Sequence, residues 1–109
     1  MIINKTTNKK ISSTELICTT FLSQLRGLMF RQKQNLVMVF PTEKNISLHT
    51  FFVFYPIDVL ILDSDKKIIE IKRNFKPFTL WNAQKKGRYV VELSSSSMNN
   101  VGDQLQSSF

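Results

Sequence analysis

The largely apolar stretch Leu48–Asp63, LHTFFVFYPIDVLILD, constrains the fold more than any other part of the chain. Most of its residues are β-branched, aromatic or leucine, and no glycine interrupts them, which favours strand over helix. Pro56 divides it, because proline cannot donate to a sheet ladder and restricts the residue before it. We therefore predict two adjacent strands in the core, Leu48–Phe54 and Ile57–Asp63, with a kink at Tyr55 and Pro56.

The composition indicates a mainly β protein. Ile, Val, Thr, Phe, Tyr and Trp make up about a third of the chain, whereas Ala occurs only once. The 109 residues suffice for one core and one domain, residues 1–109. We expect a small β-sandwich or a partly open barrel with one short helix, which Thr20 caps and Gly27 ends in the left-handed conformation.

Shorter apolar runs predict the remaining strands, and the segment 74–88, with its Pro, Asn and Gly, predicts a long loop. The predicted strands are Met1–Ile3, Ile11–Thr19, Leu36–Phe40, Lys67–Arg73, Tyr89–Leu93 and Val101–Leu105.

One cysteine, Cys18, excludes an internal disulfide, and we expect it to be a small buried apolar residue. No apolar run approaches the length of a membrane span, and the first residues, MIINKTTNKK, lack a hydrophobic signal core. We expect a cytoplasmic protein.

Four motifs in order carry a resemblance to a known family. They are GLMFR (Gly27–Arg31), HTFFVFYPIDVLILD, YVVEL (Tyr89–Leu93) and VGDQL. From Leu16 to Leu105 the chain resembles the uncharacterised proteins catalogued as domain of unknown function, family 192. The resemblance implies a small, mainly β sandwich with one short helix, and it implies no biochemical activity, because none is established for that family.

The chain departs from this family's pattern at three positions. An Arg is expected three residues before Gly27, where this chain has Gln24. A Met followed by a Lys or Arg is expected where this chain has Val53 and Phe54. The missing cation would have been a natural ion-pair partner for Asp58.

The net charge of +7 falls within residues 66–88. Cations interleaved with aromatic rings are typical of a site for single-stranded nucleic acid, in which the cations contact phosphates and the rings stack on bases. In the alternative interpretation, the rings cover a sheet edge and the lysines solvate it. The candidate residues, which we call the basic segment, are Lys66, Lys67, Lys72, Arg73, Lys76, Trp81, Lys85, Lys86 and Arg88.

Two polar residues interrupt the apolar stretch, and burying either without a partner is unfavourable. His49 oriented by Asp58 could act as a general base, or both could line a cleft with Arg31 that binds a small molecule or a glycan. In the structural alternative, Asp58 accepts backbone N–H groups at the kink and His49 satisfies a loop carbonyl.

The sequence contains no phosphate-binding Gly-rich loop, no CxxC or HExxH and no nucleophile elbow, so we expect neither a cofactor nor a metal. We therefore predict a non-catalytic binding module with a basic face for a polyanion such as RNA or a ribonucleoprotein. A protein partner is a further possibility. The competing hypothesis is a small-molecule or glycan-binding protein, or a weak enzyme, with a cleft at Arg31, His49 and Asp58.

Overall fold

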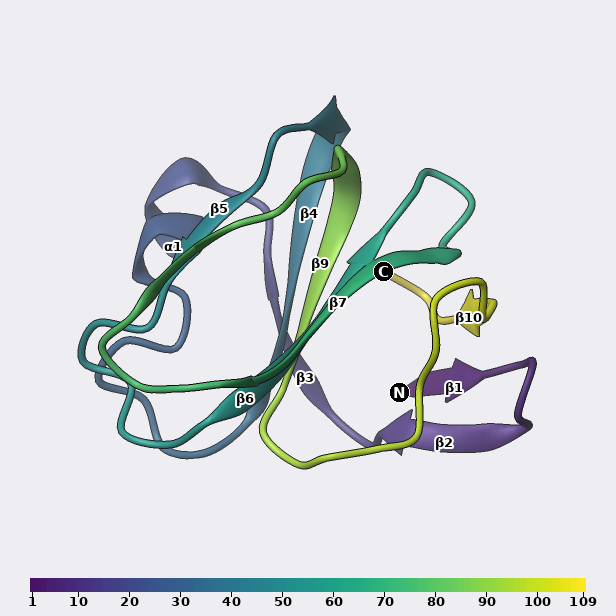
Figure 1. Cartoon of the computed structure of the whole chain (residues 1–109), viewed down its shortest axis with the longest axis horizontal. Helices are drawn as coiled ribbons and strands as arrows, with labels where there is room; N and C mark the ends of the chain where they lie inside the picture. Colours follow the sequence, from purple (N-terminus) through teal and green to yellow (C-terminus); the bar gives the residue numbers. More distant parts are fainter.

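The structure is a computed structural model that describes the backbone of residues 1–109 and all side chains except those of Phe21, Leu22 and Leu25. It is mainly β, with one short helix (Figure 1). The elements in chain order are β1 (Ile2–Asn4), β2 (Lys9–Ser12), β3 (Glu15–Cys18), α1 (Phe21–Arg26), β4 (Asn35–Lys44), β5 (Ser47–His49), β6 (Ile57–Leu62), β7 (Ile68–Phe75), β8 (Leu80–Asn82), β9 (Gly87–Leu93) and β10 (Leu105–Gln106).

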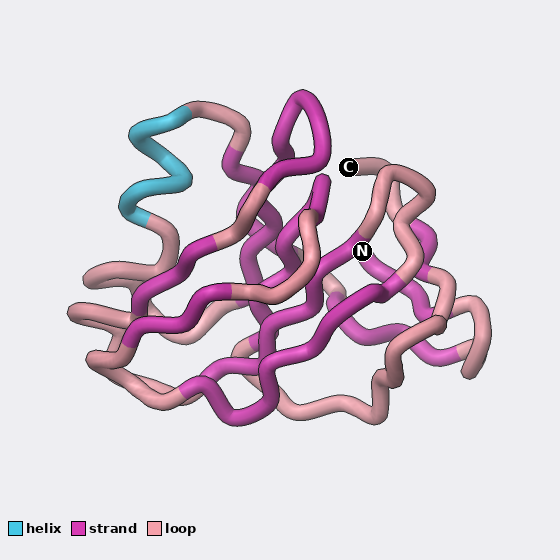
Figure 2. The backbone as a smooth tube through the Cα atoms, turned by 45° about the horizontal axis from the view of Figure 1, so that its top comes forward, coloured by secondary structure: helices cyan, strands magenta, loops and turns pink.

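A five-stranded sheet in the order β3-β4-β9-β6-β7 forms the middle of the molecule. One side is covered by the three-stranded sheet β10-β1-β2, and the other by α1 and the two-stranded sheet β5-β8 (Figures 1 and 2). The described chain therefore forms several packed sheets and no closed barrel. Both termini lie on the side of β1 and β10 (Figure 1).

Two apolar clusters fill the spaces on the two faces of the central sheet. Because successive side chains of a strand point to opposite faces, each central strand contributes to both. In β6, Val59 and Ile61 join the cluster beneath α1, and Leu60 and Leu62 join the cluster beneath β1. All six residues of β6 are buried, which explains the density of apolar residues there and confirms the second predicted strand.

The first half of the predicted core, Leu48–Phe54, was wrong. β5 ends at His49 and pairs with β8, whereas β6 pairs with β7 and β9. The chain turns at Phe52, whose φ is +61°, and the Val53 amide donates to the Thr50 carbonyl within this turn. Within the predicted strand, only Leu48 and Val53 are buried apolar side chains, whereas Phe51, Phe52 and Phe54 are exposed, so its apolar character reflects a loop with outward-facing rings.

Residues 74–88 are also not a plain loop, because they contain β8 and the first residues of β9. Ser47, Leu48 and His49 pair with Asn82, Trp81 and Leu80 in this short antiparallel ladder. A three-residue strand gives too short an alternation to be recognised in a single sequence.

The predicted helix is confirmed. Thr20 caps α1 with a capping box in which its side chain and that of Ser23 each accept a backbone N–H. Gly27 follows with φ +52°, a conformation that a side chain would strain. The parallel strands β3 and β4 flank α1, and a parallel pair requires such a crossover. Within the described residues, no helix is long and apolar enough to cross a membrane.

Candidate functional site

Three neighbouring loops, α1–β4, β5–β6 and β7–β8, lie at one end of the molecule, on the left in Figures 1 and 2. They carry four exposed phenylalanine rings that contact one another. Phe30 follows α1, Phe52 and Phe54 lie between β5 and β6, and Phe78 lies between β7 and β8. Phe30 and Phe54 are 63% and 64% exposed. The rings contact one another, with centroids of Phe30 and Phe52 stacked at 4.7 Å. We call these four residues the aromatic tip.

Three residues of the aromatic tip have a backbone conformation that phenylalanine disfavours. φ is +58° at Phe30, +61° at Phe52 and +59° at Phe78. A left-handed conformation costs a residue with a Cβ about 1–2 kcal/mol. Such strain persists only where the surrounding structure enforces it, and it gathers at functional sites.

Hydrogen bonds between the three loops enforce this conformation. The Thr50 hydroxyl donates to the Lys76 carbonyl at 2.6 Å and accepts the Thr79 amide at 2.9 Å. The Phe30 amide donates to the Phe52 carbonyl at 2.9 Å. Thr50 is 1% exposed, so this connection is shielded from water and holds the three loops in a preformed arrangement.

The loops that carry the aromatic tip are basic. Residues 26–34, 50–56 and 75–80 include Arg26, Arg31, Lys33 and Lys76 but no Asp or Glu. The one ion pair among the described residues joins the amino group of Met1 to Glu15, so no carboxylate neutralises these four cations. The tip combines exposed rings with uncompensated positive charge.

Three cations of the basic segment are held against the protein itself. Lys66 donates to the Ser107 carbonyl at 2.9 Å, Arg88 donates to the Phe40 carbonyl at 3.0 Å, and Arg73 donates to the carbonyl of Asn99. Burial lowers the pKa of Lys66. These side chains fasten loops and the C-terminal segment.

The other members of the basic segment are distributed over β7, β8 and the loop before β9. Lys67 and Lys76 are exposed at opposite ends of β7, and Lys85 and Lys86 are exposed in the loop before β9. Lys72 and Trp81 are half-buried. Trp81 packs edge-on against the buried ring of Phe75 at 6.3 Å, and thus covers the core beneath β8.

A second feature lies between α1, β5 and the central sheet, where Glu92 of β9 lines a cavity of about 90 Å³. Glu92 alternates with Val91 and Leu93, and it shares the face of Val90, which belongs to the cluster beneath α1. Its side chain is 5% exposed, and no hydrogen bond from a described group contributes to the environment of its carboxyl group. Burial raises the pKa of Glu92 to about 7.

Glu92 was not among the residues predicted to form a site. One feature of the sequence could have indicated it. Glu92 is the only acid in the apolar strand Tyr89–Leu93, and such an acid is buried if the strand lies in the middle of a sheet that is covered on both sides. That position became evident only from the pairing of β9 with both β4 and β6.

Gln24 and His49 line the same cavity. The Gln24 side-chain amide donates to the carbonyls of Cys18 at 3.2 Å and Val39 at 2.9 Å, which fastens α1 to the ends of β3 and β4. His49 Nδ1 accepts the Phe51 amide at 3.2 Å, so the neutral ring carries its proton on Nε2. His49 therefore accepts a backbone N–H, whereas the sequence suggested that it would satisfy a carbonyl.

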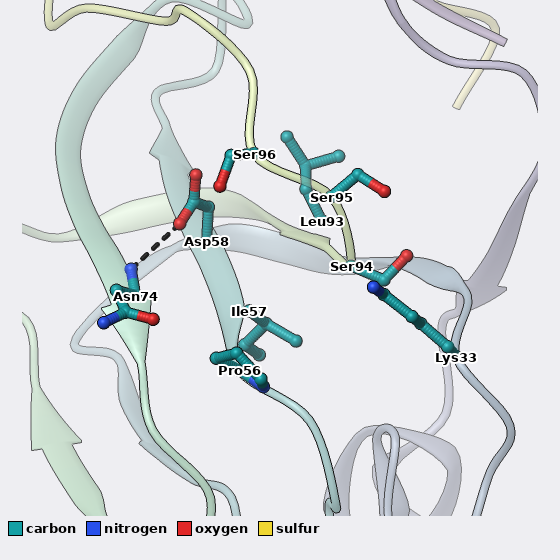
Figure 3. Close-up of a pocket in the computed structure, with 9 residues that line it drawn as sticks. All are labelled: Lys33, Pro56, Ile57, Asp58, Asn74, Leu93, Ser94, Ser95 and Ser96. Atoms are coloured by element: carbon teal, nitrogen blue, oxygen red, sulfur yellow. Dashed lines mark hydrogen bonds between the residues drawn. The ribbon is translucent and has the colours of Figure 1, made fainter.

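Asp58 lies elsewhere, in a cavity of about 330 Å³ at the start of β6 (Figure 3). Its Oδ1 accepts the Asn74 amide at 2.9 Å. Between the pairs Ile57–Phe75 and Val59–Lys72, one residue of β6 faces two of β7, so Asp58 supports a β-bulge in which Asn74 has φ +50°. Figure 3 shows Lys33 reaching towards Ser94 across the same cavity.

The three residues predicted to share a cleft are therefore separated. Asp58 and His49 line different cavities on different elements. Arg31 donates through Nε to the Gly27 carbonyl at 2.9 Å, beside the aromatic tip. Cys18 is 1% exposed, as expected, and burial raises the pKa of its thiol, so it is not an activated nucleophile.

Fold and site together define a small, mainly β domain with a preformed aromatic and basic surface. The chain belongs to the family of proteins described as domain of unknown function 192, Uncharacterized ACR, whose model matches residues 2–107. This confirms the resemblance drawn from the four motifs.

The family includes archaeal proteins named UPF0127. A UPF0127 protein of Pyrococcus horikoshii is 30% identical over 113 residues, which cover 97% of each chain. One from Thermococcus kodakarensis is 38% identical over 96 residues, 84% of this chain and 60% of the relative. One from Thermococcus sibiricus is 34% identical over 84% of this chain and 62% of the relative. The chain thus spans about three fifths of the two Thermococcus proteins.

Two crystal structures share the fold. A candidate transcription regulator from Sinorhizobium meliloti 1021 has a TM-score of 0.85 at 20% identity, over 96% of this chain and 88% of that chain. A protein of unknown function from Novosphingobium aromaticivorans DSM 12444 has a TM-score of 0.85 at 17% identity, over 96% of this chain and 81% of that chain. At these identities the likeness concerns the fold alone.

Proposed function

We propose that the protein is a non-catalytic binding module that holds single-stranded RNA at the aromatic tip. The observation that carries this proposal is the exposure of four phenylalanine rings, three of them on strained backbone, in loops that contain cations and no acid. Aromatic faces stack on bases of any sequence, and Lys or Arg contact the phosphates. A cytoplasmic location belongs to the same proposal, because single-stranded RNA is available there.

The basic segment takes part through its exposed members. Lys76 lies in the same loop as Phe78 and is the cation best placed to contact a phosphate next to a stacked base. Lys67, Lys72, Lys85 and Lys86 attract the polyanion at longer range, whereas Lys66, Arg73 and Arg88 hold backbone carbonyls and contribute mainly to stability.

The test is fluorescence anisotropy with a labelled oligouridine of about ten nucleotides, within the range that one small domain covers. Phe52→Asn removes the ring but suits the left-handed backbone. We expect it to weaken binding by about 1–3 kcal/mol, the contribution of one stacked base. Met98→Ala is the matched control, because Met98 is 83% exposed in a loop outside the tip.

A second pair of variants tests the phosphate contacts. Lys76→Gln should reduce the slope of the logarithm of affinity against the logarithm of salt concentration by about one. Lys9→Gln removes an exposed cation of β2 and should leave this slope nearly unchanged.

Rings and cations also suit an anionic membrane surface, so vesicles of phosphatidylserine and phosphatidylcholine form a parallel arm. Sedimentation with these vesicles together with no oligouridine binding at about 50 mM salt, where phosphate contacts are strong, would refute the RNA proposal. Equal affinities of Phe52→Asn and the parent protein would refute the role of the tip.

A further inference from the structure

The cavity beneath α1 has the features of a built binding site. The Glu92 carboxyl group lines it, is 5% exposed, and receives no hydrogen bond from any described donor. No fully enclosed side-chain oxygen or nitrogen among the described residues lacks a hydrogen-bond partner, so the Glu92 carboxyl oxygens are open to the cavity, where a ligand can reach them. A carboxylate largely withdrawn from water is unfavourable unless a donor group compensates it. A ligand group that donates hydrogen bonds would stabilise the Glu92 carboxylate.

The residues that line the cavity indicate the chemical nature of the ligand's donor group. Gln24 uses its amide nitrogen on two carbonyls, which leaves its oxygen as an acceptor. The apolar part of the wall includes Leu28, Met38 and Val53, and the polar part also includes Arg26, Ser47 and His49. A metal site needs at least three ligands, but this cavity offers only the Glu92 carboxylate and the His49 imidazole. The described residues contain no group of three His, Cys, Asp or Glu placed to hold a metal ion.

The size of the cavity limits the ligand. About 90 Å³ is the share of roughly three water molecules, which is enough for a compact head group but not for a whole metabolite. A second cavity of about 150 Å³ adjoins it, because both are lined by Gln24, Met38, Ser47 and Leu48. Phe40 and Ile46 make the second cavity suitable for an aliphatic chain.

We propose that Glu92 binds the primary ammonium group of a small ligand, whose short aliphatic chain lies in the adjoining cavity against Phe40 and Ile46. An ammonium group is compact and has three donors, which matches the acceptors of Glu92 and Gln24. Arg26 lines the inner cavity and Lys44 the adjoining one. Lys44, at the far end of the ligand chain, favours a ligand with a distal carboxylate over a simple amine, and the experiment separates the two.

Isothermal titration calorimetry with n-butylamine, δ-aminovalerate and n-butanol at about pH 8 tests the proposal, because Glu92 is then mostly ionised. We expect both amines to bind and butanol not to bind. δ-Aminovalerate should bind more tightly than n-butylamine because Lys44 contacts its carboxylate, and Lys44→Gln should remove that difference.

Glu92→Gln should weaken amine binding at least about tenfold, because a hydrogen bond to a charged group contributes that much. Asp65→Asn is the matched control, because Asp65 is exposed and no described group donates to its side chain. Circular dichroism establishes that both variants are folded. Amine binding should also strengthen between about pH 5 and about pH 8, in step with ionisation of Glu92.

Two results would overturn the proposal: no heat from either amine at millimolar concentration, or equal affinity in Glu92→Gln and the parent protein. Neither bears on the RNA proposal, because oligouridine binding at the tip does not need the Glu92 charge. Glu92→Gln should bind oligouridine as the parent protein does.

Discussion

Replacing Glu92 by Gln should stabilise the protein at high pH and leave its stability nearly unchanged at low pH. The folded-state pKa of Glu92 is raised to about 7 from its ordinary value of 4.5, because burial disfavours the charged carboxylate. Between these two values the folded state holds a proton that the unfolded state has lost. Stability therefore falls as pH rises from about 4.5, and it levels off above about 7.

The size of the effect follows from the two pKa values. One pH unit corresponds to about 1.4 kcal/mol, so ionisation of Glu92 costs about 3 kcal/mol of folding free energy by about pH 8. Gln has nearly the same shape and no charge, so Glu92→Gln should avoid this loss.

The assay is urea unfolding of the parent protein, Glu92→Gln and Asp65→Asn at several values between about pH 5 and about pH 8. The free energies of the parent protein and Glu92→Gln should agree within about 1 kcal/mol at the low end and differ by about 3 kcal/mol at the high end. A difference that does not change with pH would refute the reasoning. It would mean that the carboxyl group is solvated or has a donor in the folded protein.

Two further substitutions test how the site is held. Asp58→Asn keeps an acceptor for the Asn74 amide and should cost about 1 kcal/mol, whereas Asp58→Ala should cost about 1–3 kcal/mol, as measured by urea unfolding; equal, negligible losses would show that Asp58 is not structural. Thr50→Val removes the hydroxyl that joins Lys76 and Thr79, so it should cost about 1–3 kcal/mol and speed amide exchange in both loops; unchanged exchange would contradict the role of Thr50.

The core of the fold could be predicted where strong local signals coincide with burial. The residues Ile57–Leu62 do not alternate between apolar and polar, because β6 is covered on both faces. Pro56 marks the start of this strand. Thr20 and Gly27 mark the two ends of α1 because capping is a local interaction.

The aromatic tip could not be predicted by the same reasoning. Phenylalanine is typical of strands, and the turn at Phe52 is imposed by hydrogen bonds that Thr50 makes with residues more than twenty positions away. Basic residues interleaved with Phe75, Phe78 and Trp81 did point to this part of the chain. Phe78 belongs to the aromatic tip, but Phe75 lies in the core and Trp81 packs against it, and nothing in the sequence indicated that Phe30, Phe52 and Phe54 would join Phe78.

Mapping the RNA contact by ¹⁵N nuclear magnetic resonance tests the central proposal most directly. On addition of oligouridine, we predict amide shift changes in residues 26–34, 50–56 and 75–80 and none in β1, β2 or the loop 94–100. The changes should be lost in Phe52→Asn and retained in Met98→Ala. Shifts confined to Lys85, Lys86 and their neighbours, or no shifts at about 50 mM salt, would contradict it.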